Sequence, residues 1–187
     1  ASQDALTLSK QLVQMIRAIQ RHRGMSMATL GGNRDFKEPL AQLQRQLKSR
    51  LLSFKAFSEG TGLLSEQTLE ELNRAWITIS HNWQEDSVLD NYELHCHLLE
   101  QLLALLGGLS RRLESPLLPD QQAQTQPPTS NPGKATRPSR LQTLELLHFC
   151  TRLLPSVVEQ LGRIRALSSY AAALGWCGPQ EEAKLRY

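Results

Sequence analysis

Hydrophobic residues recur along most of the chain at alternating steps of three and four, the spacing that places side chains on one face of an α-helix. In the first such segment, 8–31, the stripe consists of Leu12, Ile16, Ile19, Arg23, Ser26 and Leu30. Further stripes predict helices over about 36–57, 65–83, 87–113 and 140–174. We expect Gly31-Gly32 and Gly175 to end the first and last helices, and Pro155 to kink or split the last one.

The segment 114–139 lacks this pattern and holds six of the nine prolines, together with Gln, Thr and Ser. It cannot bury enough surface to offset its ordering entropy, so we expect a mobile connection within one domain spanning 1–187. The predicted fold class is all-α, an up-and-down antiparallel bundle of five to six helices whose first and last helices are parallel neighbours. That arrangement needs separate helices over 65–83 and 87–113, and a single continuous rod there is the alternative.

Composition supports packed helices, because 40% of the 187 residues are hydrophobic while only 5% are aromatic. A net charge of +3 is too small to indicate nucleic acid as a partner. Cys96, Cys150 and Cys177 are an odd number without CxxC spacing, so we expect reduced thiols and a cytoplasmic protein. No apolar run reaches the roughly 18 residues of a membrane span, and no signal peptide is visible.

Metal, cofactor and catalytic motifs are not expected. His81 is isolated, and His95 and His97, which flank Cys96, are two residues apart and therefore on opposite sides of a helix. No nucleophile motif or phosphate-binding loop occurs, so we do not expect an enzyme.

An internal repeat stands out. The segment 21–26 (RHRGMS) near the end of the first helix is repeated as 163–168 (RIRALS) near the end of the last one. Arg23 and Ser26 occupy stripe positions where Leu or Ile would be expected. In the last helix the stripe through Leu161 places Arg165 and Ser168 inward, whereas a competing stripe through Ile164 leaves Arg165 at the edge. Arg21 and Arg163 lie off the stripes, and Arg163 is expected at the surface, where it can pair with Glu159.

Neither copy of the repeat has an acidic residue close after it, and an unpaired cation inside a bundle costs several kcal/mol. Two guanidinium groups suit a small planar oxyanion, with the Ser26 and Ser168 hydroxyls completing the site. Arg21 and Arg163 are the further candidate anion-binding residues. Gly24 and Ala166 would allow close helix approach and leave room for the anion. The alternative is purely structural, with Arg23 and Arg165 paired to acids such as Glu100 or Glu145.

The same residues carry a family resemblance. The run from Arg23 to Leu30 is similar to the signature of the nitrate- and nitrite-sensing (NIT) domain, and the run from Leu161 to Ser168 with 171–175 resembles the C-terminal motif of that family. The resemblance covers both ends of the chain and is loose in the middle. His22 departs from the residue types that often precede the family's arginine.

The resemblance implies an all-helical sensor that binds nitrate or nitrite through Arg23 and Arg165 and passes a conformational change to an output domain. Family members are usually longer, and this chain ends 12 residues after Gly175, so we expect its output either to be absent or to come from a partner. A homodimer is possible. The alternative function is a helical protein–protein interaction module without an anion ligand.

Overall fold

The computed structural model describes residues 2–115, 140–176 and 178–186. Its elements, in chain order, are α1 (Ser2–Leu30), η1 (Arg34–Phe36), α2 (Lys37–Thr61), α3 (Glu66–Asn82), α4 (Val88–Glu114), α5 (Arg140–His148), the π-turn η3 (Phe149–Leu153), α6 (Leu154–Leu174) and α7 (Pro179–Arg186). The predicted all-α bundle is confirmed. The prediction of a mobile connection over 114–139 falls almost entirely outside the described residues.

Local sequence explains where the helices begin and end. Ser65 and Ser87 are the N-caps of α3 and α4, and each side chain accepts a hydrogen bond from the backbone N–H three residues later. Gly62 and Gly175 end α2 and α6 in the left-handed conformation. The chain therefore turns between α3 and α4, which are two helices rather than one rod.

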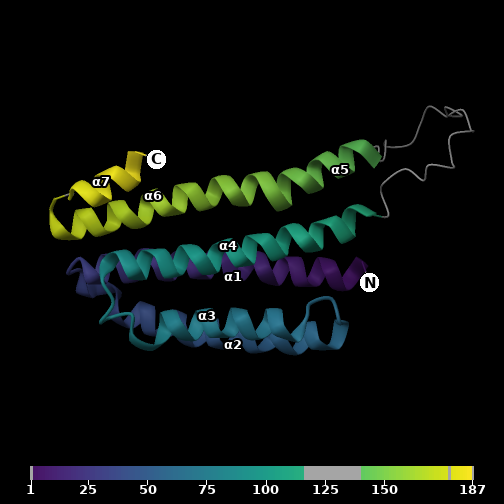
Figure 1. Cartoon of the computed structure of the whole chain (residues 1–187), viewed down its shortest axis with the longest axis horizontal. Helices are drawn as coiled ribbons and strands as arrows, with labels where there is room; N and C mark the ends of the chain where they lie inside the picture. Colours follow the sequence, from purple (N-terminus) through teal and green to yellow (C-terminus); the bar gives the residue numbers. More distant parts are fainter. Residues whose placement is uncertain (1, 116–139, 177, 187) are drawn as a thin grey trace, which may run out of the picture.

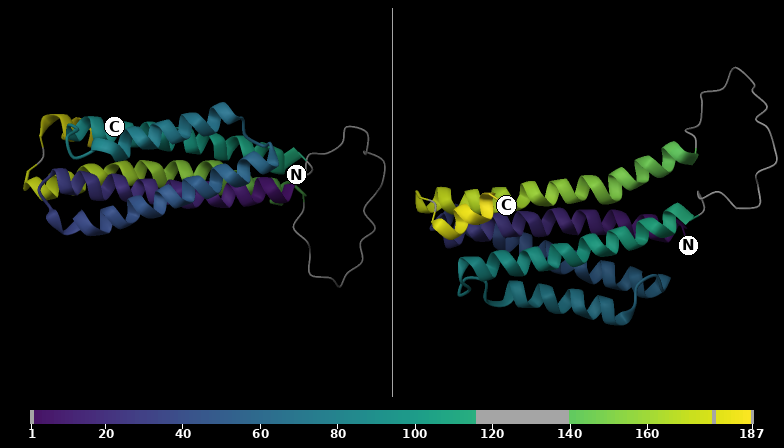
Figure 2. Two further views of the ribbon diagram at one scale, coloured as in Figure 1. Left: turned by 90° about the horizontal axis from the view of Figure 1, so that it is seen from below. Right: turned by 45° about the horizontal axis from the view of Figure 1, so that its top comes forward.

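The helices form three layers. Figure 1 shows α1 and α4 in the middle layer, α5 and α6 on one side of it and α2 and α3 on the other. The two further views show the same order, with α1 and α6 side by side and running in the same direction (Figure 2). The predicted parallel pairing of the first and last helices is thus confirmed, and the two copies of the repeat lie at the same end of the bundle.

Pro155 neither splits nor reverses the last helix. The π-turn directly before it contains a hydrogen bond from the N–H of Leu154 to the carbonyl of Phe149, five residues back. A π-turn rearranges the backbone bonds where proline has no N–H to donate. As a result α5, η3 and α6 continue as one gently bent rod (Figure 2).

The main core lies between the middle layer and the α2–α3 layer. Most of its members come from α1 and α4, and Leu47, Phe54 and Trp76 are among those from the outer helices. A smaller cluster around Met27, Tyr92, Ala166 and Leu167 joins α6 to α1 and α4. None of the described helices is long and apolar enough to cross a membrane.

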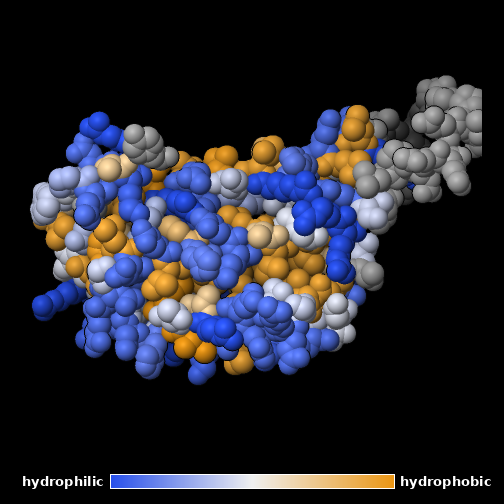
Figure 3. All heavy atoms as spheres, in the orientation of Figure 1, coloured by the Kyte–Doolittle hydropathy of each residue, from blue (hydrophilic) through white to orange (hydrophobic). Residues whose placement is uncertain are grey.

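The outer side of the α5–α6 rod is different, because large apolar side chains remain exposed on it. They are Leu141, Leu146, Phe149, Leu153, Leu154, Val157, Val158, Leu161 and Ile164. Apolar atoms reach the surface along this rod (Figure 3). The α5–α6 layer is thus packed on one side and uncovered on the other.

Candidate functional site

The contact between α1 and α6 is centred on a buried ion pair. The two terminal guanidinium nitrogens of Arg23 donate to the two carboxylate oxygens of Glu159, at 2.6 and 3.2 Å. Arg23 is 0% exposed and Glu159 is 2% exposed. A third contact runs from Nη1 of Arg23 to the sulfur of Cys96 on α4, at 3.4 Å. The pair therefore lies where α1, α4 and α6 meet.

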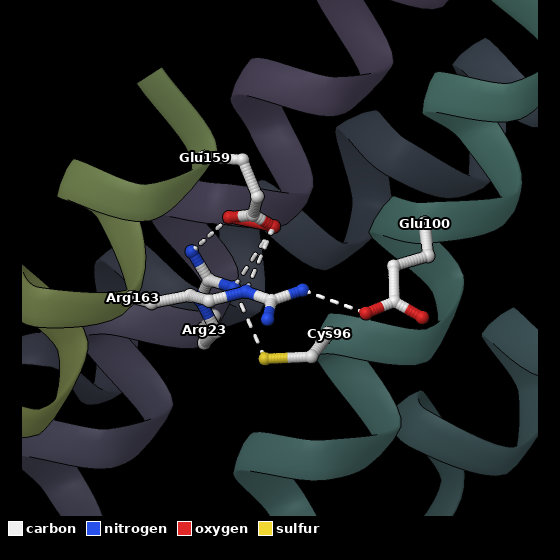
Figure 4. Close-up of polar contacts among 5 residues, drawn as sticks. All are labelled: Arg23, Cys96, Glu100, Glu159 and Arg163. Carbon is white, nitrogen blue, oxygen red and sulfur yellow. Dashed lines mark hydrogen bonds and ion pairs between the residues drawn. The ribbon is translucent and has the colours of Figure 1, made fainter. Parts of the chain in front are cut away.

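A second guanidinium group approaches the same carboxylate. Arg163, one turn after Glu159 on α6, has its Nε 3.9 Å from Glu159 and donates to Glu100 of α4 at 2.8 Å. Figure 4 shows Glu159 and Arg163 projecting from α6 toward Arg23, and Arg163 reaching across to Glu100. Burial lowers the pKa of Arg163, but the Glu100 hydrogen bond and nearby negative groups outweigh it and raise the pKa above its ordinary value.

Two glycines allow α1 and α6 to approach this closely. A Cβ atom at Gly162 would lie 2.8 Å from Nη2 of Arg23, so only glycine leaves space for the guanidinium beside the α6 backbone. A Cβ atom at Gly31 would lie 2.8 Å from the Cβ of Ala173. Gly24, by contrast, faces open space, so the expectation that it allows helix approach is wrong. Ala166 is fully buried, as that expectation required.

Three buried hydrogen-bond donors at the site lack an acceptor among the described residues. They are Nε of Arg23, Nε of Arg163 and the amide nitrogen of Gln20. The Gln20 amide lies near Gly162 and hence beside the guanidinium of Arg23. Because buried donors without acceptors are costly, these groups favour an additional oxygen-rich species at this position.

Tyr92 of α4 forms the floor of the site. The guanidinium carbon of Arg23 is 6.0 Å from its ring centroid, at the outer limit of a cation–π contact. Burial, together with the neighbouring Cys96, raises the pKa of Tyr92 to about 12. The phenol is therefore a neutral group beside the cations.

A histidine pair lies directly behind Arg23. Nδ1 of His95 is 2.6 Å from the carbonyl of Asn91, which can only accept, so that nitrogen carries the proton. Nε2 of His95 must then accept from Nδ1 of His22 at 2.7 Å, and Nε2 of His22 accepts from the amide of Gln44 at 3.0 Å. All three of these hydrogen bonds can form together only when both imidazole rings are neutral.

Burial explains the electrostatics of the pair. It lowers the pKa of His22 well below 6.5, with His95 adding to the effect. Burial also lowers the pKa of His95 to about 4; its bond to Asn91 opposes this and the charge of Arg23 adds to it. The ring of His22 also packs edge-on against Trp76, with the centroids 5.2 Å apart.

The structure separates the predicted anion-binding residues into two groups. Arg23 and Ser26 are buried, as predicted, and the Ser26 hydroxyl donates to the Arg23 carbonyl and accepts from Asn91. Arg165 and Ser168 are exposed, so the inward positions that the stripe through Leu161 gave them are wrong, and Arg165 lies outside as the competing stripe had it. Arg163 was expected at the surface and is partly buried; its predicted pairing with Glu159 is present, which brings that side chain to the ion pair.

The physical reason is the helical phase of α6. Its buried positions are Glu159, Ala166 and Leu167, which place Arg163 rather than Arg165 toward α1 and α4. The predicted stripes followed the leucines and valines of α6, yet those residues are exposed, either on its uncovered side or, as with Leu154 and Val158, at its edge beside α1. Arg23 and Arg165 consequently do not meet at one anion.

Arg165 instead borders a groove between α1 and α6. The groove has a volume of about 530 Å³ and an apolar floor that includes Ile16 and Val158. Arg17 and Arg21 line it together with Arg165, and the described part of the chain places no acidic residue against these three side chains. Of the predicted site residues, the structure thus brings Arg21 and Arg165 to this groove.

The sequence predicted only part of the role of Glu159. Its spacing to Arg163 indicated an i, i+4 pair, and that pair is present, but its contact with Arg23 joins residues 136 positions apart. The structural alternative named Glu100 or Glu145 as partners of Arg23 and Arg165, and Glu100 in fact pairs with Arg163. No signal in the sequence indicated the contact between His22 and His95.

No protein-family model matches the sequence, and neither the curated proteins nor the solved structures contain a significant match. The class of the protein is therefore defined by its fold and site alone: a helical bundle in which a buried arginine–glutamate pair, with a second, partly buried arginine beside it, joins the first and last long helices.

Proposed function

We propose that this protein is a nitrate- or nitrite-binding sensor module in the regulation of nitrogen metabolism. The single observation that carries the proposal is the convergence of Arg23 and Arg163 on one buried carboxylate, with spare donors around it. A carboxylate is a small planar oxyanion, as nitrate and nitrite are. The residues that hold Glu159 are thus the residue types that would hold either anion.

Exchange of Glu159 for the ligand is the proposed signal. In the free protein Glu159 neutralises Arg23; an arriving anion takes over that role and leaves Glu159 with Arg163. Since Arg23 lies on α1 and Glu159 on α6, the exchange alters the contact between these helices. A ligand shifts such an equilibrium by its difference in affinity for the two states, and an output protein would read the changed position of α6.

A nitrate titration of thermal stability tests the proposal. At about ten times the dissociation constant, a ligand of the folded state adds about 1.4 kcal/mol, which raises the melting temperature of a protein of this size by about 3–6 °C. We expect nitrate or nitrite to produce this rise beyond that of chloride at equal ionic strength. No difference between nitrite, nitrate and chloride at tens of millimolar contradicts the proposal.

Two neighbouring arginines provide matched variants. Arg163→Ala removes the second guanidinium group from the cluster, whereas Arg165→Ala removes an exposed one two residues away. We expect the nitrate effect to be lost in the first variant and retained in the second. The reverse result would restore the pairing of Arg23 with Arg165 that the repeat indicated.

The second candidate function is a helical interaction module that needs no anion. It is favoured by the uncovered apolar side of the α5–α6 rod, because contiguous exposed apolar patches mark protein interaction sites. Absence of any specific anion effect, together with retained folding of Arg163→Ala, would favour this candidate.

A further inference from the structure

The exposed apolar side chains of the α5–α6 rod form a face with a symmetric spacing. We define the α5–α6 face as Leu146, Phe149, Leu153, Val157, Leu161 and Ile164, all of which are exposed. Val157 and Leu161 are each two residues from the buried Glu159 and so lie on the opposite side of the helix. The face spans 146–164, about 27 Å of helix.

Its residues are equally spaced on either side of Pro155. Leu153 and Val157 are each two residues from Pro155, Phe149 and Leu161 six, and Leu146 and Ile164 nine. An antiparallel copy of the same rod, related by a two-fold axis at Pro155, would therefore place an apolar residue opposite each of the six residues of the α5–α6 face. The exposed Leu154 and Val158 lie outside this face, opposite Ser156 and Arg152. Self-complementarity of this kind is what an interface between two identical chains requires.

Charge follows the same symmetry. Glu145 and Arg165 are each ten residues from Pro155, next to the outermost apolar pair. Both side chains are exposed, and neither has an ion-pair partner in the described ranges. In the antiparallel arrangement Glu145 of one copy faces Arg165 of the other, twice per pair of chains.

We propose that two copies of this chain associate through the α5–α6 face, antiparallel about a two-fold axis at Pro155. Each Phe149 packs on the partner's Leu161, and each Glu145 forms an ion pair with the partner's Arg165. The groove beside the face, whose lining includes Leu154 and Val158, receives side chains of the second rod. The interface is independent of the proposed anion ligand, because none of its contacts uses Arg23, Glu159 or Arg163.

Sedimentation analysis of the full chain from about 1 to 100 μM tests the association, since interfaces of ordinary size span a wide range of affinities. We expect a species of twice the chain mass for the wild type and a monomer for Leu161→Asp. Leu52→Asp on α2 is the matched control, because Leu52 is 61% exposed and Leu161 is 60% exposed. It should remain dimeric, and both variants should keep their helical circular dichroism. A monomeric wild type over the whole range, or a dimer in Leu161→Asp, overturns the proposal.

Charge exchange tests the register. Glu145→Lys and Arg165→Glu each place two like-charged contacts in a homodimer, and we expect each variant alone to dimerise at least about tenfold more weakly. When the two variants are mixed, both contacts pair opposite charges again, so a heterodimer should form with an affinity near that of the wild type. Weakened variants that do not recover on mixing would rule out this register.

Discussion

Arg23 and Glu159 are separated by 136 residues and form a two-pronged ion pair inside the bundle, with a shortest distance of 2.6 Å. The pair joins the first long helix to the last one, and a second arginine approaches it from Glu159's own helix. Its stability is therefore coupled to the position of α6.

Removing the carboxylate should destabilise the fold strongly. Glu159→Gln leaves the buried guanidinium of Arg23 without a counter-charge, and breaking such a pair costs about 3–5 kcal/mol. Urea denaturation measures the loss. The matched control is Arg45→Ala, which breaks the exposed pair with Glu38 and should change stability by less than about 1 kcal/mol. Equal effects of the two changes would contradict the structural importance of the buried pair.

The same variant tests whether an anion binds at the position of the Glu159 carboxylate. Glu159→Gln removes the internal competitor while both arginines remain, so we expect nitrate or nitrite to restore part of the lost stability. The rise in melting temperature with nitrate should be larger in Glu159→Gln than in the wild type. A rise no larger than that in chloride would show that the vacated position does not accept the anion.

Two glycine-to-alanine substitutions should change the stability of the fold in opposite directions. Gly162→Ala places a methyl group 2.8 Å from the Arg23 guanidinium, and overpacking of this kind costs about 1–3 kcal/mol. Gly24→Ala lies in the interior of α1 with open space around it, so helix propensity should add about 0.5–1 kcal/mol. Thermal or chemical denaturation of both variants checks the prediction, and destabilisation by Gly24→Ala would contradict it.

The histidine pair predicts a loss of stability in acid. The unfolded chain binds a proton near pH 6.5, whereas the pKa of His95 in the fold is about 4 and that of His22 is also lowered. The contribution of the neutral histidine pair to the stability of the fold is thus fully present above pH 6.5 and decreases as the pH falls toward 4. Each histidine contributes a slope of up to about 1.4 kcal/mol per pH unit.

Denaturation at pH 7.5, 6, 5 and 4.5, which spans the approximate window of the two shifted values, measures this dependence. His95→Gln should flatten the profile, because the variant no longer has that buried proton-accepting site. His97→Gln, on the exposed side of α4, should keep the wild-type profile. A profile unchanged by His95→Gln would show that the pair does not control acid stability.

Much of the fold was predictable because it depends on local features. The helix boundaries at Ser65, Ser87 and Gly175 match the predicted ones, since caps and glycine turns act on neighbouring residues. The parallel packing of the first and last helices was predictable because each turn between consecutive long helices reverses the chain direction, and the helices over 65–83 and 87–113 are separate. The short helix α7 and the π-turn were not predicted, because neither has a strong local pattern.

The candidate site was only half predictable. The stripe of α1 correctly placed Arg23 and Ser26 inside, because Leu12, Ile16 and Ile19 on the same stripe are buried. The same reasoning was wrong for α6, where the leucines and valines are largely exposed and the inward face carries Glu159, Gly162 and Arg163. A stripe identifies an apolar face but not the neighbour that covers it.

The sequence by itself determined the helices, their order and the burial of an arginine in α1, because hydrophobic spacing and capping are encoded within a few turns of chain. Only the tertiary structure decided which carboxylate neutralises that arginine and which arginine of α6 lies beside it. The rotation of α6 about its own axis depends on Gly162 fitting against Arg23 of α1, and on Gly31, directly after α1, fitting against Tyr170 and Ala173 of α6. These are contacts between segments more than a hundred residues apart. Such contacts leave no periodic trace in either segment.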